Sequence, residues 1–169
     1  MSVCSSVNSH MLKEQTTTDL INQYSNIIKE LKERGVIRTK NLLGDLGEYL
    51  AIEYYCNTGG LPKLQAAPAN TKNIDAISIN GDRYSVKSTT GKLTGVFWGL
   101  EPPDSKKKDK PKFEYVIIVM FDDDYELEKI IELDWDLFLK HKKWHKTMSS
   151  WNLRITEKLI DDSNIIYSK

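Results

Sequence analysis

The chain has 169 residues, of which 40% are hydrophobic and 28% are charged, and this composition excludes a disordered tail and fits one globular domain. No apolar run approaches the roughly 20 residues that a membrane helix needs, so we expect no membrane partner. The 24 basic and 24 acidic side chains cancel, which removes the simplest argument for a nucleic-acid partner without excluding one. The start lacks the basic and apolar segments of a signal peptide, so we expect a cytoplasmic protein.

The N-terminal part is polar and rich in Ser and Thr, and it is predicted to be a flexible segment over residues 1–16. A single domain is expected over residues 17–169. Apolar residues recur at spacings of three and four over residues 20–31, which is the period of a helix. Thr18 or Asp19 is the expected N-cap of this helix.

A glycine and two prolines mark where the next predicted elements begin or end. Gly35 stands just past the first helix, where a C-terminal glycine belongs. A second helical pattern runs over residues 39–54 and stops by residues 57–60. The segment that follows contains Pro62 and Pro68, and a short strand is predicted over residues 63–67.

The remaining pattern is mostly that of strands. Two short β-prone runs, residues 73–79 and 83–88, flank an Asn-Gly-Asp sequence that is typical of a hairpin loop. Residues 113–121 read as a buried central strand. Further elements are expected as a strand at 127–133, a short helix at 134–140 capped by Asp134, and a strand or extended segment at 153–156. This order predicts an α/β (α+β) domain with a mixed sheet flanked by helices.

The length of the hairpin loop decides which side chains share a face of the sheet. Because side chains alternate along a strand, Asp75 shares a face with Ser85 and Lys87 only if the loop has an odd number of residues. A two-residue turn would separate them. A three-residue loop over residues 79–81, with Gly81 in the left-handed conformation, places Asp75 opposite Ser85. Lys87 then lies on the diagonal, and a carboxylate and an ammonium converge.

A carboxylate beside a lysine suits metal-assisted hydrolysis of a phosphodiester. The carboxylate can hold Mg²⁺, which neutralises charge on the phosphate and acidifies a bound water. The lysine can orient or deprotonate that water. The structural alternative is that Asp75 and Lys87 form a partly exposed cross-strand ion pair that contributes about 0 to 1 kcal/mol.

The segment from residue 41 to residue 121 resembles the PD-(D/E)xK nuclease superfamily, which has the restriction-endonuclease-like fold. In that pattern a helix with a glutamate precedes a hairpin with an aspartate on one strand and an acid-x-Lys triplet on the next. Glu48 corresponds to the helix residue, Asp75 to the aspartate, and Ser85-Val86-Lys87 to the triplet. Ser85 replaces the acid of the triplet, which implies either a relocated carboxylate or a loss of catalysis.

The resemblance implies an endonuclease that hydrolyses DNA with Mg²⁺ or Mn²⁺, in prokaryotic restriction or defence. The catalytic residues that it implies are Asp75, Lys87, Glu48 and Ser85, and the metal-site residues are Asp75, Glu101, Glu48 and Val86. The second carboxylate could come from Glu48 or from Glu101. Glu101 follows a Gly-rich segment, residues 91–99, that could fold back across the site.

A lysine-rich run is the candidate DNA-contacting segment. Its members are Lys106, Lys107, Lys108, Lys110 and Lys112. They are interpreted as phosphate contacts, with a solvated loop as the alternative. A homodimer is expected if the protein cuts both strands. Two other hypotheses stay open: a non-catalytic nucleic-acid-binding or interaction module of the same fold, and a structural subunit whose acidic stretch, residues 122–136, meets a basic partner.

Overall fold

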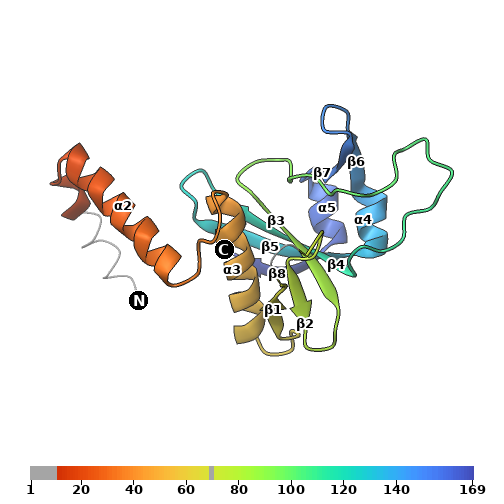
Figure 1. Ribbon diagram of the computed structural model, residues 1–169, viewed down its shortest axis with the longest axis horizontal. Helices are drawn as coiled ribbons and strands as arrows, with labels where there is room; N and C mark the ends of the chain where they lie inside the picture. The colour runs from red at the N-terminus through yellow and green to blue at the C-terminus, as the bar shows by residue number, and fades with distance from the viewer. Residues whose placement is uncertain (1–10, 69–70) are drawn as a thin grey trace. The chain divides into compact units, whose positions relative to one another are not determined.

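The structure is a computed structural model that describes residues 11–68 and 71–169 (Figure 1). The chain divides into two compact units, Met1–Leu42 and Leu43–Lys169. The predicted flexible segment, residues 1–16, falls mostly outside the described residues. The second unit contains the hairpin and the central strand that the sequence singled out.

The first unit contains helix α2 (Thr17–Glu33). Its N-cap is Thr16, whose side-chain oxygen accepts a hydrogen bond from the Asp19 amide at 3.2 Å, so the predicted caps Thr18 and Asp19 are wrong. Both lie inside the first turn, where a side chain is too far along the helix to cap its first amides. Gly35 has φ 72°, which confirms the predicted glycine past the helix end.

The elements from α3 onward form one six-stranded and one two-stranded sheet with helices. In chain order they are α3 (Leu42–Asn57), β1 (Leu64–Ala66), β2 (Ala76–Ser78), β3 (Arg83–Thr89), β4 (Tyr115–Phe121), β5 (Leu127–Asp134), α4 (Trp135–His141), β6 (Lys142–His145), β7 (Ser150–Leu153), α5 (Glu157–Asp162) and β8 (Asn164–Ser168). Within the described ranges, no helix has both the length and the apolar character needed to cross a membrane.

The larger sheet is mixed. Its strand order is β1-β2-β3-β4-β5-β8, with β3 parallel to β4 and every other neighbouring pair antiparallel. The smaller sheet is the hairpin β6-β7. The predicted class, an α/β domain with a mixed sheet flanked by helices, is therefore confirmed.

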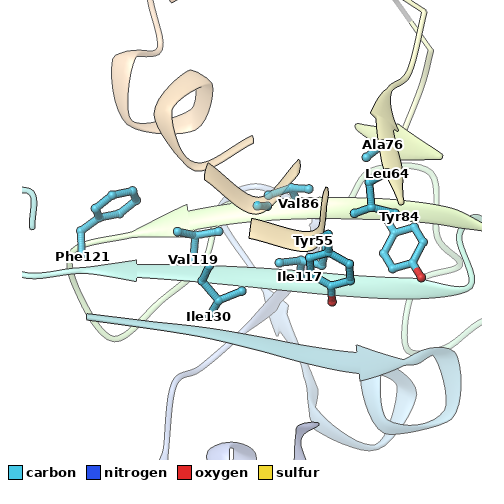
Figure 2. Close-up of a cluster of buried hydrophobic side chains, with 10 residues drawn as sticks. Tyr55, Leu64, Ala76, Tyr84, Val86, Ile117, Val119, Phe121 and Ile130 are labelled. Atoms are coloured by element: carbon cyan, nitrogen blue, oxygen red, sulfur yellow. The ribbon is translucent and has the colours of Figure 1, made fainter. Parts of the chain in front are cut away.

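The large sheet has a hydrophobic core on each face because β4 is buried along most of its length and its side chains alternate. On one face, Ile117 packs with Tyr55 of α3 in the cluster that Figure 2 shows. On the other face, Ile118 packs with Phe138 of α4 and Leu159 of α5. Figure 1 shows α3 on one side of the sheet and α4 and α5 on the other. We call these the α3 face and the α4 face.

Helix α3 approaches the sheet closely at Gly47. A Cβ atom on Gly47 would lie 1.8 Å from the Ser88 hydroxyl oxygen and 3.5 Å from the Val119 Cβ. Only glycine permits this contact, because any larger side chain would overlap Ser88. The contact fixes α3 against β3 and β4 on the α3 face.

The C-terminal part of the chain differs most from the sequence prediction. The short helix α4 and its cap are confirmed, since the Asp134 side chain accepts a hydrogen bond from the Leu137 amide at 2.8 Å. Strand β7 begins three residues before the predicted extended segment 153–156 and overlaps it at Leu153, and β6, α5 and β8 were not predicted. Each has four to six residues, too few to display a clear hydrophobic period.

Candidate active site on the β2-β3 hairpin

The loop between β2 and β3 has three residues. The Ser78 amide donates to the Asp82 carbonyl oxygen at 2.8 Å, which leaves residues 79–81 as the loop. Gly81 has φ 90°, a conformation that glycine adopts without steric cost. Both observations confirm the predicted odd-numbered loop, and with it the parity on which the site depends.

Asp75, Ser85 and Lys87 converge on the α4 face of the sheet, as the parity predicted. One carboxylate oxygen of Asp75, Oδ2, accepts a hydrogen bond from the Ser85 hydroxyl at 3.3 Å. The Lys87 Nζ lies 3.9 Å from the same oxygen. Ser85 is buried, whereas the Asp75 and Lys87 side chains are 24% and 22% exposed. A small solute can therefore reach the acid and the base together.

The backbone of β3 fixes the Asp75 carboxylate. Because β2 begins only at Ala76, the Val86 amide lies beyond the β2-β3 ladder, and Asp75 Oδ2 accepts its hydrogen bond at 2.7 Å. Asp75 thus completes the strand pairing with its side chain. Its other oxygen, Oδ1, accepts no hydrogen bond from the part of the chain that the structure describes, so it is available to a metal ion or a water.

The Gly-rich segment folds back past the site, as the sequence suggested. The Lys87 Nζ lies 5.2 Å from the centre of the Phe97 ring, and a Cβ on Gly95 would lie 4.0 Å from the Lys87 Cδ. Farther along, a Cβ on Gly99 would lie 3.9 Å from the Asn73 Nδ2. The segment therefore holds the lysine stem while the ammonium group stays partly exposed.

Glu101 follows this segment, and its own loop fixes it. Its carboxylate oxygen Oε2 accepts a hydrogen bond from the Ser105 hydroxyl at 2.7 Å. Its amide donates to Asp109 Oδ1 at 2.7 Å, and its carbonyl oxygen accepts from the Trp151 indole at 2.7 Å. A metal-binding role for Glu101 stays a prediction.

Glu48 lies on the helix that covers the other face of the sheet. It is half-buried and follows Gly47, which contacts Ser88 on the α3 face. The Asp75 and Lys87 side chains lie on the α4 face, so Glu48 would have to reach them around the end of β3. The role of Glu48 in this site stays a prediction.

A dication at this site would have one firmly placed carboxylate. Among the described residues, no three His, Cys, Asp or Glu side chains form a group that could hold a metal ion. Mg²⁺ keeps several waters and commonly uses one or two carboxylates together with substrate phosphates. The open Asp75 Oδ1 fits a metal shared with a substrate, and Val86 stays the other predicted metal-site residue on this hairpin.

The lysine-rich loop is anchored at its middle by an aspartate. Asp109 Oδ2 lies 2.5 Å from the Lys142 Nζ, and the two side chains are only 8% and 13% exposed. The Lys142 Nζ lies 4.1 Å from the centre of the Trp151 ring. This loop and Gly99 surround a recess of about 400 Å³, which four of the candidate lysines line: Lys107, Lys108, Lys110 and Lys112.

No pattern in the sequence predicted Asp109, Lys142, Trp151 or Phe97 as site residues. Asp109 carried one signal, since it is the one acid within a run of lysines. Its partner, Lys142, lies 33 positions away in the chain, and only the folded structure brings the two together. The position of Phe97 beside Lys87 likewise depends on how the Gly-rich segment folds.

Comparison of the chain with protein-family models finds no matching family, and comparison with curated proteins finds no match. We therefore infer a function from the geometry of the chain's own residues.

Proposed function

We propose that the protein is a nuclease that hydrolyses DNA phosphodiester bonds with Mg²⁺ or Mn²⁺, using the hairpin site. The observation that carries the proposal is the convergence of Asp75 and Lys87, whose Oδ2 and Nζ atoms are 3.9 Å apart on one face of the sheet. The order of helix α3, hairpin β2-β3 and central strand β4 supports a restriction-endonuclease-like fold as part of the same proposal.

Each side chain of the hairpin would have a distinct role in hydrolysis. Asp75 Oδ1 would hold the dication, which when bound neutralises phosphate charge and acidifies a water. The Val86 amide and the Ser85 hydroxyl keep the Asp75 carboxylate in place. The Lys87 ammonium would orient the attacking water or contact a phosphate oxygen. Water adds at phosphorus and loses a proton to solvent, while the bridging oxygen of the cleaved bond leaves and takes up a proton from solvent to become a hydroxyl group.

The lysine-rich loop would supply contacts to the DNA backbone. Four of its lysines line one recess, and the buried Asp109-Lys142 pair fixes the loop to the β6-β7 hairpin. A fixed loop loses less conformational entropy on binding than a freely moving one does. Such lysines bind phosphates without reading sequence. A homodimer would supply the two sites needed to cut both strands.

The test is incubation of the purified chain with plasmid, linear duplex and single-stranded DNA, and with RNA, with and without Mg²⁺ or Mn²⁺. We expect cleavage that requires the metal and that Lys87→Ala removes. Lys158→Ala, which removes an exposed lysine on α5, is the matched control and should cleave as the wild type does. Metal-independent cleavage, or equal loss in both variants, would count against the hairpin site.

The second candidate is a nucleic-acid-binding module of this fold without catalysis. Ser85 favours it, because a serine stands where the superfamily has an acid. In the same assay, it would give salt-dependent DNA or RNA binding without cleavage of any substrate under any metal condition.

A further inference from the structure

A second recess opens on the α3 face of the sheet, opposite the face that carries Asp75 and Lys87. Its volume is about 410 Å³. Its walls come from the loop after α3, from the hairpin loop, and from strands β3, β4 and β5. The side chains that matter are Leu61, Pro62, Asp82, Tyr84, Tyr115 and Glu132. They include two carboxylates and no lysine or arginine.

Stacked tyrosines form one wall of this recess. The Tyr84 and Tyr115 rings are 5.0 Å apart between centres, at an angle of 21°. The Tyr55 ring meets Tyr84 edge-on at 6.0 Å, and Figure 2 shows these two side chains next to each other at one end of the cluster. Within the described part of the chain, neither the Tyr84 nor the Tyr115 hydroxyl has a hydrogen-bond partner. The half-buried Tyr115 therefore offers its hydroxyl to a ligand, whereas Tyr84 is only 2% exposed and supports the Tyr115 ring from behind.

The two carboxylates of the recess have only neutral partners among the described residues. Glu132 accepts a hydrogen bond from the Tyr55 hydroxyl at 2.7 Å, and Asp82 accepts one from the Ser78 hydroxyl at 3.0 Å. Burial, and after it the charges of Glu132 and Asp82, raise the pKa of the Tyr84 hydroxyl. Both negative charges thus act on the tyrosine wall, and among the described residues no lysine, arginine or histidine forms an ion pair with either carboxylate.

We propose that this recess binds an organic cation, a guanidinium or primary ammonium group on an alkyl chain. The carboxylates supply charge and hydrogen-bond acceptors, and the half-buried Tyr115 ring attracts cations. A planar guanidinium also stacks on aromatic rings. Leu61 and Pro62 offer apolar contact to the alkyl chain.

Two sources share this chemistry: a free polyamine, and an arginine or lysine side chain of a protein partner. The recess does not depend on the proposed nuclease activity, because its side chains lie on the other face of the sheet.

The test is a calorimetric or NMR titration of the full chain with butylguanidine, and with butylurea as its neutral counterpart. We expect saturable binding of butylguanidine with a Kd of about 1 mM or tighter, and at least about tenfold weaker binding of butylurea. Asp82→Asn and Glu132→Gln should each weaken butylguanidine binding about tenfold. Asp136→Asn removes the same charge from an exposed position on α4 and should leave binding unchanged.

Equal binding of butylguanidine and butylurea, or an equal loss in Asp82→Asn and Asp136→Asn, would overturn the proposal. If Glu132→Gln does not fold by circular dichroism, Tyr115→Leu provides a second test, since it removes a ring face and should also weaken binding. Unchanged affinity in a folded Tyr115→Leu would equally overturn it. Spermidine binding that exceeds that of an arginine-containing peptide assigns the recess to free polyamines, and the reverse order assigns it to a protein partner.

Discussion

Strand β3 contributes to two ion pairs that differ in how closely their charged groups approach. Arg83 and Glu114 form a close pair, with Nη2 2.5 Å from Oε1, Nε 2.9 Å from Oε2, and the Arg83 amide 2.7 Å from Oε2. Lys87 and Asp75 approach only to 3.9 Å, and the shortest hydrogen bond to Asp75 comes from the Val86 amide.

The Arg83-Glu114 pair stabilises the fold, whereas the Lys87-Asp75 pair leaves a carboxylate oxygen that can bind a ligand. The hydrogen bond to Arg83 lowers the pKa of Glu114, and Glu114 in turn raises the pKa of Arg83. This pair joins β3 to the residue just before β4 and uses both carboxylate oxygens. At Asp75 one oxygen is left open, and the lysine is near enough to share a ligand with it. The same strand therefore contributes both to an ion pair that connects β3 to β4 and to the candidate reactive site.

The largest expected effect comes from replacing Asp75 while keeping its hydrogen bonds. Asp75→Asn retains an oxygen that can accept from the Val86 amide but removes the charge that would hold a metal. We expect DNA cleavage to fall at least about 100-fold, with a change in the free energy of unfolding below about 1 kcal/mol. Glu114→Gln makes the same chemical change in the other pair and should leave cleavage within about twofold. Cleavage rates and urea denaturation together check this. Equal cleavage by the two variants would show that Asp75 is no more important for cleavage than Glu114.

The next effect separates cations that are free to bind phosphate from those that are already paired. Neutralising Lys107 and Lys110 should reduce the slope of log K against log salt for DNA binding by about 0.9 for each lost contact. Arg83→Gln removes a cation that is bound to Glu114, so the slope should stay as in the wild type. Fluorescence anisotropy over a range of salt concentrations measures the slope. An unchanged slope in the lysine variants would assign the loop to solvent.

A smaller effect is expected on stability when the close pair is broken. Glu114→Gln should lower the free energy of unfolding by about 1 kcal/mol, because charge-assisted hydrogen bonds are lost at a site where both side chains remain 37% exposed. Asp75→Asn should cost less than this. Urea denaturation of both variants against the wild type gives the order, and the reverse order would show that Asp75 is the main structural acid of β3.

The smallest effect concerns pH. The pKa of Glu114 is lowered from its usual value of 4.5, so its contribution to stability is present above that value and is lost as the pH falls through the folded-state pKa. The stability difference between the wild type and Glu114→Gln should therefore be constant near neutral pH and shrink below about pH 4. Denaturation curves at several pH values check it, and a difference that grows with acidification would contradict the sign.

The sequence predicted the local features of the hairpin because short-range rules govern them. Gly81 and strand alternation were enough to bring Asp75, Ser85 and Lys87 to one face. The central strand was equally clear, since Tyr115–Phe121 is an unbroken apolar run.

The features that the sequence did not predict depend on contacts between distant segments. Lys142 contacts Asp109 from 33 positions away in the chain, and Glu132 contacts Tyr55 from 77 positions away. The short elements β6, α5 and β8 owe their structure to the neighbours on which they pack. The predicted N-cap of α2 was wrong because the sequence alone did not show where the helix begins. Good capping residues stand at three nearby positions, Thr16, Thr18 and Asp19.

The indole of Trp151 contacts the lysine-rich loop, so its fluorescence can report on what binds there. It donates a hydrogen bond to the Glu101 carbonyl oxygen at one end of the loop, and the Lys142 ammonium that holds Asp109 lies over its ring. A cation beside an indole changes the energy of its excited state. A polyanion bound to the lysines of this loop would change the charge around the indole and therefore shift the emission of Trp151, without any label attached to the chain.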